Sequence, residues 1–159
     1  MMKMLESHAF AAAVLAAALL ALPGCDGRKR EPSVHDAWVR MPAAKGQPGA
    51  AYFRLEGNVE GTRLTDITSP LVRRIELHET VEKNGVTRME KRRDIEFPYR
   101  GALVFEPGGR HAMLFGINRA VKPGLNIPLT FSFNTAAPVT VVAEVRSASG
   151  ETEEAHKGH

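Results

Sequence analysis

The segment at residues 127–133 reads IPLTFSF, and its apolar residues recur at every second position. Such alternation places the apolar side chains on one face of a β-strand. Pro128 cannot donate a backbone hydrogen bond, so we expect this strand to begin at a sheet edge. Residues 139–145, VTVVAEV, repeat the pattern, with Val139, Val141, Ala143 and Val145 sharing one face. The two segments indicate neighbouring strands that pack one face against a core.

Working outward from these segments, short extended stretches separated by turn residues continue back to residue 34. No stretch shows a helical period over about ten residues. The sequence therefore predicts an all-β, antiparallel sandwich or barrel. The predicted strands are residues 34–40, 50–55, 63–69, 74–79, 86–90, 102–105, 111–115, 126–133 and 139–145. The predicted core residues are Trp38, Phe53, Leu55, Leu77, Leu103, Leu129, Phe131 and Val141.

The clearest turn signal is Asn84-Gly85, which lies between two predicted strands. Both residues accept the positive φ angles of a type I′ turn. The pair therefore predicts a tight hairpin between residues 74–79 and 86–90. Other turns are expected at residues 57–58, 107–109 and 123–124, which are rich in glycine, proline and asparagine.

The N-terminal residues predict export. An apolar run at residues 9–22 has about 14 residues, which is shorter than the ~20 needed to span a bilayer and typical of a secretory signal. It ends in Leu22-Pro23-Gly24-Cys25, which resembles the lipobox of bacterial lipoproteins, with Pro23 as a departure. Cys25 is the only cysteine and is the expected lipidation site. An ordinary signal peptide with an incidental cysteine is the alternative. The expected divisions are residues 1–24 signal peptide, 25–33 lipidated cysteine and tether, 34–147 folded domain and 148–159 disordered polar tail.

Charge and location narrow the class of partner. Lys and Arg number 21 against 18 Asp and Glu, and basic residues cluster at 28–30, 73–74 and 91–93. On an exported lipoprotein, we expect the first cluster to lie near anionic lipid headgroups and the other two to be solvated strand faces. No nucleic-acid partner is expected. Asp26 follows the cysteine expected to be lipidated, which resembles the inner-membrane retention signal of enterobacterial lipoproteins. This resemblance implies a location on the periplasmic face of the inner membrane.

A mature chain that starts at Cys25 has no free thiol for a metal site or a nucleophile. The soft ligands that remain include His78, Met89, His111 and Met113. His111 and Met113 are two residues apart in a predicted strand, so their side chains share a face. Ile75 and Leu77 take the core face of their strand, which turns His78 outward. The predicted hairpin then folds Met89 back towards His78.

These ligand types favour one metal. Thioether sulfur is soft and neutral, and it prefers Cu(I) to Zn(II), Ca(II) or Mg(II). Two imidazoles and two thioethers also suit an oxidising compartment, where free cysteines are lost to disulfides. Taken singly, a methionine in a β protein is usually core filling, and a histidine is usually a surface or hydrogen-bonded residue. The combination is what predicts a Cu(I) site.

The spacing His78, ten residues, Met89, twenty-one residues, then His111-x-Met113 matches the signature of the periplasmic copper chaperone family PCuAC. The surrounding segments at residues 36–40, 69–72, 76–80 and 106–114 also resemble that family. The resemblance implies a cupredoxin-like or immunoglobulin-like β-sandwich that binds Cu(I) through these four side chains. It further implies delivery of copper towards the dinuclear copper site of cytochrome c oxidase, with an oxidase subunit or a Sco-type thiol protein as acceptor.

Some members of that family carry a C-terminal extension that binds Cu(II), whereas this tail has only His156 and His159. A weak Cu(II) site there is a secondary possibility. No nucleophile–base pair or carboxylate dyad is evident, so we expect a binding protein and not an enzyme. Two alternatives stay open: a copper buffer without delivery, and a metal-free binding module of the cell envelope. A blue-copper electron carrier is disfavoured because no cysteine is free to form its copper–thiolate bond.

Overall fold

The computed structural model describes residues 31–57 and 59–149. These residues form ten β-strands, and none of them lies in a helix. The strands are β1 Ser33–Arg40, β2 Gly49–Glu56, β3 Arg63–Thr68, β4 Val72–Lys83, β5 Val86–Arg92, β6 Ile95–Glu96, β7 Ala102–Phe105, β8 His111–Ile117, β9 Asn126–Phe133 and β10 Val139–Arg146. The described part of the chain accordingly holds no helix with the length and apolarity needed to cross a membrane.

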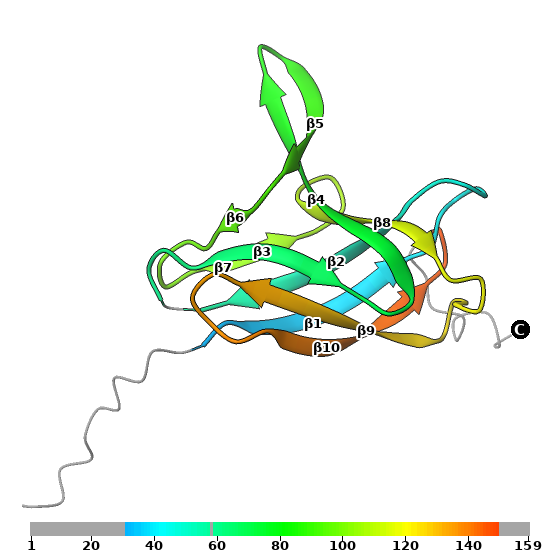
Figure 1. Ribbon diagram of the computed structural model, residues 1–159. Helices are drawn as coiled ribbons and strands as arrows, with labels where there is room; N and C mark the ends of the chain where they lie inside the picture. Colours follow the sequence, from blue (N-terminus) through cyan, green and yellow to red (C-terminus); the bar gives the residue numbers. More distant parts are fainter. Residues whose placement is uncertain (1–30, 58, 150–159) are drawn as a thin grey trace, which may run out of the picture.

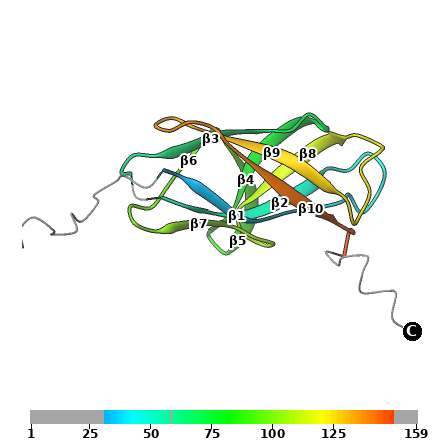
Figure 2. The ribbon, with the colours of Figure 1, turned by 90° about the horizontal axis from the view of Figure 1, so that it is seen from below.

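The strands form a β-sandwich around one core. Their order is β5-β4-β8-β2-β1-β10-β9-β3-β6, and β7 pairs with β2 beside this path. Among the described strands, only β1 and β10 pair in parallel; the other ladders are antiparallel. The path folds back on itself, so that β3 and β7 lie in opposite layers (Figure 2). The predicted all-β sandwich is therefore confirmed.

The strands follow the alternation in the sequence closely. Ile127, Leu129, Phe131 and Phe133 are buried along β9, as their period of two predicts. β3 pairs with β9 only from Thr130 onward, so the start of β9 has β10 as its one partner, as Pro128 indicated. Each of the nine predicted segments coincides with a strand. Sequence reasoning missed β6, and it ended β4 four residues early.

Most of the predicted core residues are buried, and one is wrong. Trp38 is only partly buried and lies outside the core cluster. A bulge between His35 and Trp38, with Asp36 at φ 52°, shifts the alternation of β1. Val39 therefore faces the core. Trp38 packs against Tyr52 on the other face of the sheet, with ring centroids 4.5 Å apart and ring planes tilted by 36°. Val141 packs at the margin of the core. The buried members of the predicted set are Phe53, Leu55, Leu77, Leu103, Leu129 and Phe131.

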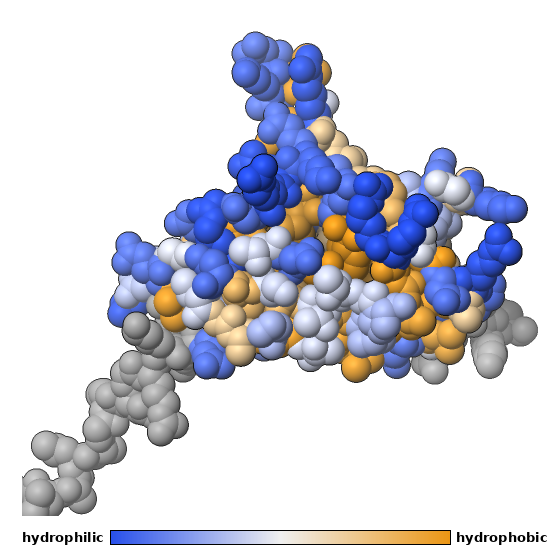
Figure 3. All heavy atoms as spheres, viewed as in Figure 1, coloured by the Kyte–Doolittle hydropathy of each residue, from blue (hydrophilic) through white to orange (hydrophobic). Residues whose placement is uncertain are grey.

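One hairpin projects from the body of the sandwich (Figure 1). β4 pairs with β8 only as far as His78, whereas its pairing with β5 continues to Lys83. Residues 79–90, which we call the arm, therefore have no third strand beside them. Asn84 and Gly85 close the arm with φ angles of 55° and 73°, as the predicted turn requires. Every residue of β5 is exposed, and hydrophilic residues cover most of the arm (Figure 3).

Candidate metal centre

His78 is the point from which the candidate site is built, because it lies on β4 between two partner strands. Its register partner on β8 is His111, and its register partner on β5 is Lys91. Directly opposite residues of an antiparallel pair project from the same face. The two imidazole rings accordingly lie nearly parallel, with centroids 6.0 Å apart and planes at 21°. The histidines predicted from the sequence to come together are cross-strand neighbours.

The two methionines occupy diagonal positions on the same face. Met113 pairs with Glu76, and Met89 pairs with Thr80. Each is thus two register positions from His78, one on β8 and the other on β5. Diagonal neighbours in an antiparallel pair lie roughly 7–8 Å apart, within reach of long side chains. Met89 is 56% exposed in the arm, whereas Met113 is partly buried in the body. All four predicted ligands therefore share one face; their role as ligands stays a prediction.

The two rings differ in which nitrogen is already engaged. Nε2 of His78 lies 3.2 Å from Oε2 of Glu76, and its Nδ1 is buried with no hydrogen-bond partner among the described residues. In His111 it is Nδ1 that has a partner, because this atom lies 3.1 Å from the carbonyl oxygen of Gly109. That carbonyl also accepts a hydrogen bond from the Thr80 hydroxyl at 3.2 Å.

Glu76 carries a dense set of contacts for a single carboxylate. Lys91 Nζ lies 2.8 Å from Oε1, and Arg74 Nη1 lies 3.1 Å from the same oxygen. The hydrogen bond from Lys91, followed by that from His78, lowers the pKa of Glu76 below its ordinary value; burial opposes these effects. The carboxylate side chain is 11% exposed, whereas Lys91 and Arg74 are 60% and 58% exposed above it. Glu76 is therefore an ionised anchor beneath two cations.

A second carboxylate braces the opposite face of β4. Glu79 forms ion pairs with two arginines. Its Oε1 lies 2.6 Å from Arg110 Nη2, and its Oε2 lies 3.4 Å from Arg92 Nε. Because side chains alternate along a strand, Glu79 points away from the face that holds His78. This cluster links β4, β5 and the segment that leads into β8. It lies on the opposite face of β4 from the four candidate ligands.

The segment before β8 is a tight turn that positions His111. Gly109 N donates to the carbonyl of Glu106 at 3.0 Å, and Glu106 N donates to the carbonyl of Arg110 at 2.8 Å. Gly108 takes a φ of 85°, which is favourable for glycine. The turn directs the Gly109 carbonyl towards both His111 and Thr80. The sequence analysis did not assign three groups that contact the candidate site, namely Glu76, Thr80 and the Gly109 carbonyl. For Glu76 a signal was visible, because it lies two residues before His78 in a predicted strand and so shares its face.

The remaining histidines and methionines that the structure describes lie elsewhere. His35 is exposed on β1 and contacts Ser33 Oγ at 2.9 Å, while Met41 packs against the core. Cys25, Asp26, His156 and His159 fall outside the described residues. Within residues 31–57 and 59–149, no three His, Cys, Asp or Glu side chains gather closely enough to hold a metal ion. The donors predicted from the sequence are two imidazoles and two thioethers.

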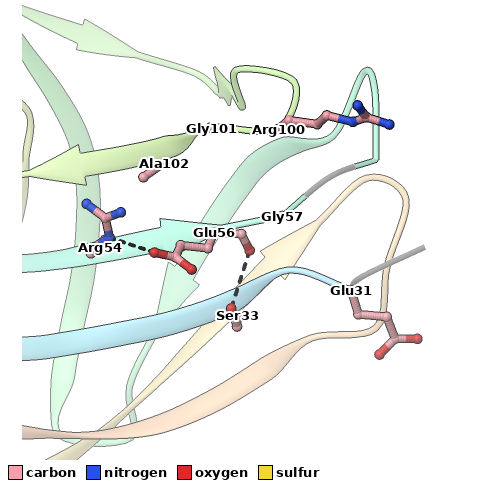
Figure 4. Close-up of a pocket in the computed structure, with 8 residues that line it drawn as sticks. All are labelled: Glu31, Ser33, Arg54, Glu56, Gly57, Arg100, Gly101 and Ala102. Atoms are coloured by element: carbon pink, nitrogen blue, oxygen red, sulfur yellow. Dashed lines mark hydrogen bonds and ion pairs between the residues drawn. The ribbon is translucent and has the colours of Figure 1, made fainter. Parts of the chain in front are cut away.

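A pocket of about 580 Å³ lies apart from this centre (Figure 4). It is formed where β1 and β7 begin and β2 ends. Arg54 Nε donates to Glu56 Oε1 at 2.8 Å within it. None of the four candidate ligands contributes to its wall. Its lining residues are Glu31, Ser33, Arg54, Glu56, Gly57, Arg100, Gly101 and Ala102.

The fold is that of solved PCuAC domains. The chain is similar to a structure described as "Copper-bound PCuAC domain from PmoF2", with a TM-score of 0.62 and 21% identity, over 75% of this chain and 95% of that domain. It is also similar to the solution structure of CuI-DR1885 from Deinococcus radiodurans, with a TM-score of 0.58 and 24% identity, over 84% and 85% of the two chains. At these identities the likeness establishes the β-sandwich.

Sequence comparison establishes the family. Residues 33–145 match the family described as "Putative lipoprotein LpqE-like", and the chain belongs to this LpqE-like family. It is 32% identical to "Putative lipoprotein Lxx21020" of Leifsonia xyli subsp. xyli (strain CTCB07), over 89% of this chain and 92% of that protein.

Proposed function

We propose that this chain is an exported, lipid-anchored copper chaperone that binds one Cu(I) through His78, Met89, His111 and Met113. The observation that carries the proposal is the register of β5, β4 and β8, which gathers all four side chains on one face around His78. Soft, neutral donors of this kind select Cu(I) over harder divalent ions. Copper in the described PCuAC domain of PmoF2 and in CuI-DR1885 supports the same assignment.

The position of the donors favours transfer over permanent storage. Met89 is exposed on an edge strand, so an incoming ligand reaches that side of the site without opening the core. In the proposed exchange, a thiolate of the acceptor forms a bond to Cu(I) as a thioether leaves. The metal keeps its oxidation state throughout. Thiolates bind Cu(I) more strongly than thioethers, so an acceptor rich in cysteine takes the metal.

The direct test is an anaerobic Cu(I) competition titration of residues 26–159, in which the lipidation site is absent. The double variant Met89→Leu, Met113→Leu keeps the side-chain volume and removes both sulfurs. We expect one tight equivalent of Cu(I) in the parent and a large loss of affinity in the variant. His35→Ala is the matched control, because it removes an exposed histidine outside the site. Equal affinity in parent and double variant would leave the metal-free envelope module as the better interpretation.

Delivery towards the dinuclear copper site of cytochrome c oxidase is part of the proposal. A deletion strain grown at limiting copper should lose oxidase activity, and the wild-type gene should restore it. The double methionine variant should not. Normal oxidase activity combined with copper sensitivity in the deletion strain would identify a copper buffer instead.

The anchor is proposed at Cys25, and the names of the LpqE-like family and of the Leifsonia relative support it. Cys25→Ser should release the protein from the membrane fraction. Separation of the two membranes tests the inner-membrane location that Asp26 suggests, and recovery in the outer membrane would exclude it.

A further inference from the structure

We propose that the two histidines present different ring nitrogens to the metal, Nδ1 from His78 and Nε2 from His111, and that Glu76 is the positioning residue that imposes this on His78. The inference rests on the proposed function, since it concerns the same four ligands. It goes further by assigning the ligating atoms and the group that selects one of them. The hydrogen-bond partners of each ring carry it.

The contacts of Glu76 fix the proton of His78. Lys91 and Arg74 both approach Oε1 of Glu76, so the carboxylate is held in place as an anion. An ionised carboxylate only accepts hydrogen bonds, so the Nε2 atom of His78, at 3.2 Å from Oε2, carries the proton. In a neutral imidazole the other nitrogen then holds the lone pair. For His78 that atom is Nδ1.

The surroundings of Nδ1 point to a ligand. This atom is buried, and no described residue offers it a hydrogen bond. A buried polar atom without a partner is unfavourable, so such atoms are rare unless something else binds them. The His78 side chain lies on the face shared with His111, Met89 and Met113. A soft metal ion at this face satisfies the lone pair.

His111 has the opposite arrangement. The carbonyl oxygen of Gly109 only accepts, so Nδ1 of His111 donates to it at 3.1 Å and Nε2 holds the lone pair. Thr80 donates to the same carbonyl from β4, which ties the turn before β8 to the arm. Hydrogen bonds to the second ring nitrogen are the usual means by which proteins orient histidine ligands. Here a carboxylate serves one ring and a backbone carbonyl serves the other.

The test begins with the metal-free protein. Long-range ¹H–¹⁵N spectra of protein labelled at histidine distinguish the two neutral tautomers. We expect His78 to carry its proton on Nε2 and His111 on Nδ1, at a pH where both rings are neutral. Addition of Cu(I) should then move the Nδ1 resonance of His78 and the Nε2 resonance of His111. Protonation of His78 at Nδ1, or a copper-dependent shift at its Nε2, would overturn the inference.

Variants then separate positioning from folding. Glu76→Gln keeps the shape but can donate or accept, so His78 should lose its single tautomer. Copper affinity should fall by about tenfold to a hundredfold, as is typical when a partner of a ligating histidine is removed. Glu79→Gln is the matched control, because Glu79 also contacts two cations but faces away from the site. It should leave the His78 tautomer and the affinity unchanged.

The outcomes separate the two proposals. Stoichiometric Cu(I) binding with His78 ligating through Nε2 would refute the assignment of nitrogens and leave the copper-binding function standing. Equal losses of affinity in the Glu76 and Glu79 variants would refute the positioning role in the same way. Absence of Cu(I) binding by the wild-type protein would refute the proposed function itself. The tautomers of the metal-free protein are read without any variant, so a misfolded variant does not weaken the test.

Discussion

Met89 and Met113 have the same thioether group, but their side chains differ in how far the surrounding structure restricts them. Met113 is partly buried on β8, a strand with partners on both sides, whereas Met89 is exposed on the edge strand β5. A ligand held in place before binding loses less conformational entropy when the metal arrives. We therefore expect Met113→Leu to weaken Cu(I) binding more than Met89→Leu does. Competition titrations of the two single variants measure these losses of affinity. A larger loss in Met89→Leu would show that Met89, in the arm, is the more preorganised ligand.

Glu76 also links the site to the acid stability of the apo protein. Its pKa is lowered below the ordinary value of 4.5, chiefly by the hydrogen bond from Lys91. The folded state therefore releases this proton more readily than the unfolded chain does. The resulting contribution to the free energy of unfolding is fully present above that ordinary value and is lost as the pH falls through the lowered pKa.

Glu76→Gln should accordingly reduce the free energy of unfolding at neutral pH, and the gap from wild type should narrow in acid. Denaturant unfolding of the two apo proteins at a series of pH values measures the gap. A gap that is constant with pH would show that the charge of Glu76 contributes nothing to stability.

At the scale of elements, the turn of the arm permits a test of local strain. Gly85 has a φ of 73°, and a Cβ added there would meet no atom within 4 Å. The cost of Gly85→Ala is therefore backbone strain alone, about 1 kcal/mol. Because this strain falls on the arm, we expect weaker Cu(I) binding as well as lower stability. Gly46→Ala is a close control, with a φ of 86° and equally open space, in the β1–β2 loop. Gly46→Ala should lower stability without changing Cu(I) affinity. Equal Cu(I) affinities in the Gly85→Ala and Gly46→Ala variants would show that the arm does not contribute to copper binding.

The strands were predictable because their signals are local. Alternation along β9 and the positive-φ pair Asn84-Gly85 each specify structure within a few residues. β6 was missed because Ile95 and Glu96 alone show no period. Trp38 was assigned to the wrong face because the bulge in β1 reverses the alternation after His35. A bulge depends on the partner strand, so a single segment does not reveal it.

The candidate site was predictable in part for a similar reason. The spacing of His111 and Met113 places them on one face of a strand, and the hairpin turn brings Met89 back towards His78. The alignment of His78 with His111 depends on the register between β4 and β8, which are far apart in the sequence. The roles of Glu76 and Gly109 depend on that register too. They emerge only when the strands are paired.

At the scale of the whole molecule, charge around the site favours a particular kind of acceptor. Lys91 and Arg74 cover the less exposed carboxylate of Glu76, so the surface near His78 presents cations outward. Exposed charges of this kind raise the rate of encounter with an oppositely charged partner, and salt screens them over about 10 Å at 0.1 M.

Copper transfer should therefore depend on the charge of the acceptor. Two synthetic dithiol peptides, one with acidic and one with basic flanking residues, provide the comparison. We expect faster transfer from the loaded protein to the acidic peptide at low ionic strength, and a smaller difference as salt is added. Stopped-flow measurement of copper arrival on the thiolates reports the rate. Equal rates at low salt would show that these cations serve only to brace β4.

The exposed edge at β5 also governs how copies of the protein behave beside one another. Among the described strands, β5 has a single partner, so one row of its backbone groups remains open to pairing. With the proposed lipid anchor, copies of the protein would share a membrane surface, where their local concentration is high. Strand-to-strand association through β5 would bring together Arg88, Lys91 and Arg92 from two copies, together with Glu90. Clustered charges on an edge strand oppose such pairing. β5, the strand that carries Met89, is thereby protected from the self-association to which an open sheet edge is prone.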